Sequence, residues 1–138
     1  MNRNELISDL AAKWMQKADR DLLSAERELS FSDPVTESVC FHSQQAAEKY
    51  LKGFLVYHQV FFGKTHRILE LLKLCATIGP SFVDELADAD SLTDYAVAVR
   101  YPDVLLDVGK AEALDAFEMA KKVGQFVLGK MKLDGPGE

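Results

Sequence analysis

The chain has 138 residues, of which 48% are hydrophobic and 28% are charged, a composition typical of one soluble globular domain. Its 22 Asp and Glu residues outnumber its 16 Lys and Arg residues, so the net charge is −6. This acidity argues against wholesale electrostatic binding of nucleic acid, because phosphate contacts need a concentrated positive surface. A local basic stripe is still compatible with it.

Two cysteines, Cys40 and Cys75, stand among apolar neighbours. Two are too few for the disulfide framework of a small secreted domain, so we expect buried thiols in a reducing cytoplasm. The first residues lack the apolar core of a signal peptide. No run approaches the roughly 18 apolar residues that a membrane span needs. The sequence therefore predicts a cytoplasmic protein with no membrane segment.

The first predicted helix covers about residues 5–29. Its apolar side chains recur at steps of three and four and are Ile7, Leu10, Ala11, Trp14, Ala18, Leu22, Ala25 and Leu29. We expect the other face, which includes Asp21, to be solvated. A second helix is predicted over about residues 34–58, with Asp33 as its N-cap and Pro34 in its first turn. The apolar arc of this second helix spans nearly half its surface, which predicts a central position.

A third helix is expected to begin near a capping Thr65 and to end at Gly79-Pro80. Ser81 has the start signature of a fourth helical region, which we expect to be broken near Asp90-Ser91. Pro102 disfavours helical dihedrals in the residue before it and should end this region.

The last helix is predicted over about residues 110–130, with Leu114 among its inward side chains, and residues 134–138 should form a disordered tail. No alternating strand pattern competes with these helices. The pattern predicts an all-α, up-and-down bundle of about five helices, because the connections are short, and a single domain over residues 1–133.

One side of the second helix carries His42, Gln45, Lys49 and Lys52 within an arc of about 80°. This polar row has two interpretations. It is the solvated side of an amphipathic helix, with Glu48 and Lys52 as an ordinary i,i+4 pair. Alternatively, its uncharged hydrogen-bonding groups form a surface for a ligand or a partner.

Arg100 and Tyr101 stand where the fourth helical region ends, just before a proline. A guanidinium held in this place can bind a carboxylate or a phosphate in a forked geometry. The other interpretation is structural: Arg100 satisfies the last carbonyls of its helix or pairs with an acidic residue such as Asp103.

The histidines His42, His58 and His66 match no zinc-binding spacing, and Cys40 and His42 would point to opposite sides of a helix. We therefore expect no metal site and no cofactor. No phosphate-cradling glycine loop or nucleophile elbow is found either.

Several stretches together resemble the HEPN domain family. They are FHSQQAAEKYLKGFL at residues 41–55, Thr65-His66 at the start of the third helix, and Tyr95 followed by RYP at residues 100–102. The resemblance extends over about residues 8–130. It implies a small helical bundle that pairs into a homodimer. It also implies a complex with a minimal nucleotidyltransferase partner, often as a toxin–antitoxin pair.

Toxin members of this family are metal-independent endoribonucleases, marked by an Arg and, after four to six further residues, a His. The resemblance aligns Arg100 with this arginine, but the matching histidine positions hold Leu105, Leu106 and Asp107, and no histidine follows. The leading hypothesis is therefore a nucleotide-associated binding and interaction module without the ribonuclease motif.

In that hypothesis the polar row of the second helix, together with Arg100 and Tyr101, contacts a nucleotide, an RNA or the partner protein. Two alternatives remain. One is an endoribonuclease in which Arg100 acts with His42 or His66. The other is a purely structural helical protein whose polar surface has no binding role.

Overall fold

The structure, a computed structural model, describes residues 1–98 and 107–134. Within these ranges it contains six α-helices, one 3-10 helix and no strand, so the prediction of an all-α bundle is confirmed. The elements are α1 (Arg3–Leu29), α2 (Thr36–Tyr57), α3 (Ile68–Cys75), α4 (Ser81–Leu86), the 3-10 helix η1 (Ala87–Leu92), α5 (Thr93–Ala98) and α6 (Lys110–Asp134).

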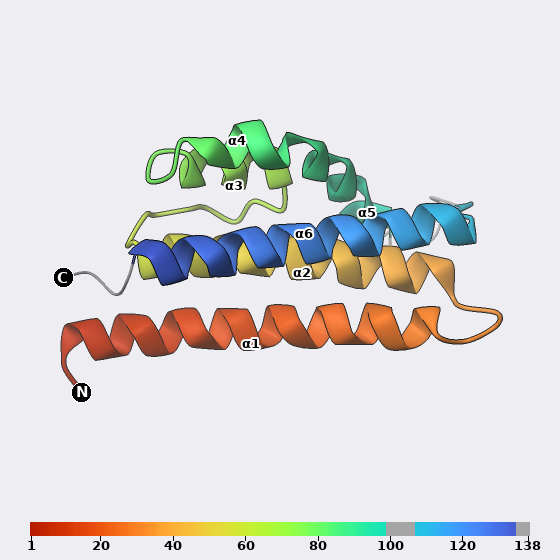
Figure 1. Ribbon diagram of the computed structural model, residues 1–138, viewed down its shortest axis with the longest axis horizontal. Coiled ribbons are helices and arrows are strands. Elements are labelled where there is room, and N and C mark those ends of the chain that lie inside the picture. Colours follow the sequence, from red (N-terminus) through yellow and green to blue (C-terminus); the bar gives the residue numbers. More distant parts are fainter. Residues whose placement is uncertain (99–106, 135–138) are drawn as a thin grey trace.

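The bundle has three layers (Figure 1). The long helix α1 forms one side, α2 and α6 form the middle, and α3, α4 and α5 form the other side. Helix α1 runs antiparallel to α2 and α6. Helix α2 packs against α1, α6, α3 and α5. Its predicted central position is therefore confirmed.

Residues 58–67 lead from α2 to α3 and carry the chain back along the bundle, so α2 and α3 run in the same direction (Figure 1). The predicted fourth helical region is divided into α4, η1 and α5. The break expected near Asp90-Ser91 falls within η1. The short 3-10 segment joins two short α-helices.

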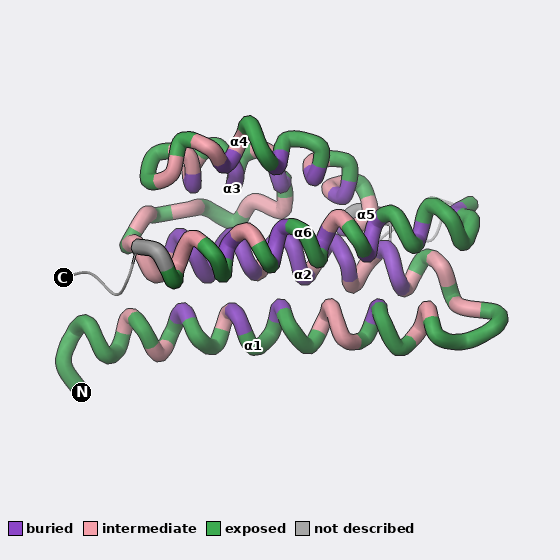
Figure 2. The backbone as a smooth tube through the Cα atoms, in the orientation of Figure 1, coloured by how far each residue is buried: buried purple, intermediate pink, exposed green. Residues whose placement is uncertain are grey.

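Burial follows this arrangement. More than half of the residues of α2 are buried, whereas most of α1 is exposed apart from a narrow inward stripe (Figure 2). Leu10 and Leu114, which were expected to point inward, are 43% and 48% exposed. For Leu10 the reason is that α1 packs mainly on a single neighbour, α2, so only one narrow face of α1 is covered.

The predicted N-cap of α2 is wrong. The helix begins at Thr36, and its N-cap residue, Val35, makes no capping hydrogen bond through its side chain. Instead, the backbone N–H of Val35 donates to Glu28 Oε2 at 2.9 Å. Glu28 lies in the last turn of α1, so a neighbouring helix supplies the carboxylate that Asp33 was expected to supply.

Helix α3 is capped by residues far along the chain rather than by Thr65. The N–H groups of Ile68 and Leu69 donate to Thr93 Oγ1 (3.1 Å) and Asp90 Oδ1 (2.9 Å). These bonds satisfy donors that have no partner within the helix. The Ser81 start signature also does not act as expected, because α4 begins at Ser81 itself and has no side-chain cap.

Candidate functional site

Two members of the polar row of α2, His42 and Lys49, contact α1. His42 Nδ1 lies 2.9 Å from Asp21 Oδ1, and Lys49 Nζ donates to Asp21 Oδ2. The Asp21 side chain is only 13% exposed, whereas those of Lys49 and His42 are 24% and 33% exposed. The expectation that Asp21 is solvated is therefore wrong. One carboxylate of α1 instead fixes two members of the row at the edge of the bundle.

A second carboxylate, Glu48 of α2, organises the rest of the row. Its Oε1 accepts a hydrogen bond from Gln44 Nε2 (3.0 Å) and lies 2.9 Å from His66 Nδ1, while its Oε2 accepts from Lys52 Nζ at 3.0 Å. Gln45 Nε2 donates to Gln44 Oε1 at 2.6 Å. The side chains of Glu48 and Lys52 are 6% and 9% exposed. They form a buried ion pair, not the ordinary surface pair of the first interpretation.

The charge of Glu48 is balanced within this cluster. Burial on its own would raise the pKa of the Glu48 carboxyl, but hydrogen bonds from Gln44 and Lys52, the charge of Lys52 and the contact with His66 together lower it. Glu48 therefore stays ionised in the interior. The cluster of Gln44, Glu48, Lys52 and His66 links α2 to the segment that leads into α3.

The structure separates the two candidate catalytic histidines. His42 contacts Asp21 at the α1–α2 seam, whereas His66 contacts Glu48 on the side of α3. A carboxylate beside a ring nitrogen fixes the orientation and tautomer of an imidazole. Arg100 and Tyr101, the other site residues predicted from the sequence, lie outside the described residues.

A further polar contact between α1 and α2 was not predicted from the sequence. The hydroxyl of Tyr50 donates to Asp19 Oδ1 at 2.5 Å. Burial, with the hydrogen bond and charge of Asp19, raises the pKa of Tyr50 well above its usual range. Tyr50 is 2% exposed, so this bond anchors a core aromatic side chain to α1.

A pocket of about 430 Å³ opens between α1 and α2, next to the polar row. Only one member of the predicted row takes part in it. The lining residues are Leu10, Lys13, Trp14, Lys17, Glu48 and Lys49. The i,i+4 spacing of Lys13 and Lys17 and of Leu10 and Trp14 is the sequence signal that could have identified it.

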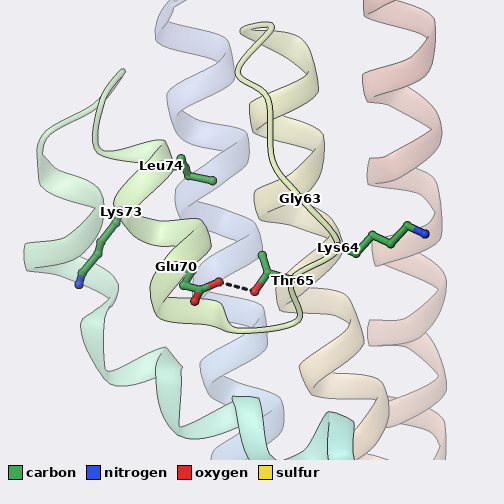
Figure 3. Close-up of a pocket in the computed structure, with 6 residues that line it drawn as sticks. All are labelled: Gly63, Lys64, Thr65, Glu70, Lys73 and Leu74. Carbon is green, nitrogen blue, oxygen red and sulfur yellow. Dashed lines mark hydrogen bonds between the residues drawn. The ribbon is translucent and has the colours of Figure 1, made fainter.

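A larger and more open pocket of about 700 Å³ lies at the start of α3 (Figure 3). Thr65 Oγ1 donates to Glu70 Oε2 at 2.6 Å, and Lys64 points away from the other labelled side chains. Among the described residues, none of the site residues predicted from the sequence lines this pocket. Thr65 and Glu70 point toward each other, whereas Lys64, Lys73 and Leu74 point in other directions (Figure 3).

In the part of the chain that the structure describes, no group of three or more His, Cys, Asp or Glu residues is placed to hold a metal ion. Among residues 1–98 and 107–134, no helix combines the length and apolar character that a membrane span requires.

Comparison with known proteins agrees with the helical bundle. The model of the family described as HEPN domain matches residues 11–131. A solved structure described as an archaeal HEPN homologue is 26% identical, with a TM-score of 0.60 over 95% of this chain and 99% of that chain. Comparison with curated proteins gives no match. Because the family model spans α1 to α6, the chain belongs to the HEPN domain family.

Proposed function

We propose that the chain is a nucleotide-associated binding and interaction module. In this proposal it forms a homodimer, pairs with a nucleotidyltransferase-type protein and lacks ribonuclease activity. The observation that carries the proposal is the role of His66. Its ring is engaged with Glu48, in a cluster whose buried members join α2 to the segment before α3. Because Glu48 also binds Gln44 and the buried Lys52, this contact is part of the packing between α2 and the segment before α3.

The sequence after Arg100 strengthens this proposal. The family motif places a histidine at position 105, 106 or 107, and the chain has Leu105, Leu106 and Asp107 there. Without that histidine, the proton transfer that RNA cleavage needs has no group at the usual place. An arginine can still hold a phosphate group by charge and forked hydrogen bonds. Binding without cleavage is the function that this combination supports best.

The test has two independent measurements. First, purified wild type and Arg100→Ala are incubated with a structured RNA in the presence of a chelator, and we expect no cleavage by either protein. Second, the chain is co-expressed with a minimal nucleotidyltransferase, and we expect a stable complex that contains two copies of this chain. Cleavage by the wild type that is lost in Arg100→Ala would overturn the claim that the chain lacks ribonuclease activity. A monomer that does not bind the nucleotidyltransferase would overturn the claim of a dimer that pairs with such a partner.

One observation favours the alternative of a metal-independent endoribonuclease. His42 is a third exposed, and its Nδ1 lies against Asp21, which is the orientation that a general base requires. If His42 replaces the motif histidine, chelator-resistant cleavage should be lost in both Arg100→Ala and His42→Ala. In Asp21→Asn it should fall less severely, because Asp21 would act only by positioning the ring.

A further inference from the structure

We propose that the edge of α1 beside α2 is a docking surface for an acidic, amphipathic helix of another protein. Its residues share one face of α1 or lie beside that face on α2. They are Leu6, Leu10, Lys13, Trp14, Lys17 and Lys49, and we call them the docking edge. The inference goes beyond the proposed function, because it requires neither a nucleotide, nor a second copy of the chain, nor a nucleotidyltransferase.

The docking edge contains a row of apolar side chains that the fold leaves uncovered. Leu6 and Leu10 are 50% and 43% exposed. Together with Trp14 they stand at steps of four residues, so the three side chains follow one another along the same face of α1. A single exposed leucine is ordinary, whereas a continuous apolar row bordered by charged groups is typical of an interaction surface.

The charged groups of the docking edge are basic. Lys13 and Lys17 stand four residues apart on α1, and Lys49 faces them from α2 across a pocket of about 430 Å³. The one carboxylate among the described residues that line this pocket is Glu48, which is 6% exposed and bound to Lys52. The docking edge therefore presents positive charge to a partner.

Two of these lysines have acidic neighbours outside the pocket. Lys13 Nζ lies 3.2 Å from Asp9 Oδ2, but the two side chains are 65% and 43% exposed, and pairs as exposed as this one contribute little. Lys49 contacts Asp21, which holds its ammonium group between the two helices. The whole chain has a net charge of −6. An acidic partner is therefore attracted to this edge and repelled by most of the remaining surface.

The spacing of the apolar row favours a helix as the occupant. Side chains at steps of four form the ridges by which one α-helix packs against another. An amphipathic helix binds in this way when its own apolar side chains recur at steps of three and four. The docking edge extends from Leu6 to Lys17, about 16 Å at a rise of about 1.5 Å per residue, which corresponds to three turns of a bound helix.

Trp14 gives this surface a rigid centre. Its indole lies edge-on to Phe62, with ring centroids 6.2 Å apart and planes at 78°. Lys52 Nζ lies 5.6 Å from the centroid of the same Phe62 ring, so the indole is supported from the buried cluster of Glu48. Tryptophans that are fixed in this way are enriched among the residues that dominate the energy of protein interfaces.

Two other kinds of occupant fit the docking edge less well. The apolar row continues to Leu6, one turn beyond the residues that line the pocket, so a small molecule in the pocket would leave part of the row exposed. Single-stranded RNA binds to basic grooves in which aromatic rings stack on successive bases. The docking edge offers two leucines and one indole instead, a surface that matches apolar side chains.

The experiment uses Trp14, the only tryptophan of the chain, as a reporter of binding. The full chain is titrated with a synthetic peptide of about 18 residues, long enough to cover the docking edge as a helix. The peptide has leucines at steps of three and four, glutamate and alanine elsewhere, and no tryptophan. We expect a saturable change in indole emission. A shuffled peptide of the same composition should bind at least about tenfold more weakly, because its leucines no longer form one stripe.

Two pairs of variants locate the contact. Lys17→Glu should weaken binding of the peptide about tenfold or more, since it places like charges opposite each other, whereas Lys121→Glu on the exposed face of α6 should not. Leu10→Ala should weaken binding several-fold. Leu128→Ala is its matched control, because Leu128 is 40% exposed on α6 and Leu10 is 43% exposed on α1. Urea titrations verify that each variant is folded.

Each other outcome overturns the proposal and leaves the tests of the proposed function unchanged. Equal affinities in the two members of each pair would place the peptide elsewhere. Equal binding of the shuffled peptide would reduce the contact to charge alone. A short single-stranded RNA that binds more tightly than the peptide and is weakened by Lys17→Glu would assign the edge to nucleic acid. Absence of peptide binding would remove the docking role, and loss of a homodimer in Leu10→Ala would then assign the edge to a second copy of the chain.

Discussion

The carboxylate of Glu48 lies 2.9 Å from the ring Nδ1 of His66, and this contact joins the middle of α2 to the segment before α3. The same carboxylate binds Lys52 one turn further along α2, at 3.0 Å. Both members of that ion pair are almost fully buried. A single acidic side chain therefore neutralises a buried lysine and positions a loop.

Glu48→Gln should strongly destabilise the fold. The amide keeps the size of the side chain but removes the charge, so Lys52 is left as an uncompensated buried cation. Breaking a buried pair in this way costs about 3 kcal/mol. Urea denaturation followed by far-UV circular dichroism would measure the change in the free energy of unfolding.

The matched control for this substitution is Glu26→Gln. Glu26 is exposed on α1, and the same chemical change there should alter the free energy of unfolding by less than about 0.5 kcal/mol. Similar urea midpoints for the two variants would show that the buried ion pair does not contribute to stability.

The stability of the wild type should depend on pH through the same residue. The pKa of Glu48 in the fold lies below its ordinary value of 4.5. Such a carboxyl contributes its full stabilisation above the pKa of the unfolded chain, and the contribution is lost as the pH falls through the folded-state pKa. The difference in free energy of unfolding between wild type and Glu48→Gln should therefore be constant from neutral pH to near 4.5 and shrink below it. Urea titrations over a series of pH values measure it, and a difference that grows in acid contradicts the assignment.

The two cysteines should be chemically inert in the folded protein. Cys40 and Cys75 are both fully buried. Burial raises the pKa of the Cys40 thiol to about 11 and that of the Cys75 thiol to about 12, and thiolate is the reactive form. Labelling with an aromatic disulfide reagent at neutral pH should be slow and should accelerate with urea.

Ser24→Cys, which adds a thiol to an exposed position of α1, should react at once with one equivalent of reagent. Rapid labelling of the wild type would contradict the burial.

Much of the fold could be predicted because helical periodicity is a local signal. The predicted extents of α1 and α2 agree with the structure to within two residues at each end, and the central position of α2 follows from the spacing of its apolar residues. The caps of α2 and α3 could not be predicted, because Glu28, Asp90 and Thr93 reach them through tertiary contacts. When a helix is capped by a side chain that is far away in the sequence, the residues just before the helix contain no capping signal.

The candidate site also combines features that local spacing predicts with features that depend on tertiary contacts. Spacing alone grouped His42 and Lys49, but it could not identify the carboxylate that binds both of them. Asp21 lies three residues after Ala18 and four before Ala25, both fully buried, so its position belonged to the inward stripe of α1. An acidic residue in an inward stripe indicates a buried polar contact, whereas its charge alone suggested exposure.

Gly124 should tolerate no side chain, because the ring of Tyr50 occupies the space beside it. A Cβ atom at Gly124 would lie 2.7 Å from Tyr50 Cε2 and 2.8 Å from Cζ, and the ring is held by its bond to Asp19. Gly124→Ala should therefore destabilise the fold by about 2 kcal/mol, which is typical of overpacking.

Gly129→Ala is the matched control in the same helix, since a Cβ there meets nothing within 4 Å. Because alanine favours helix more than glycine does, Gly129→Ala should stabilise the fold by about 0.5 to 1 kcal/mol. Urea titrations should thus give shifts of opposite sign, and two shifts of the same sign would show that Tyr50 can move away from α6.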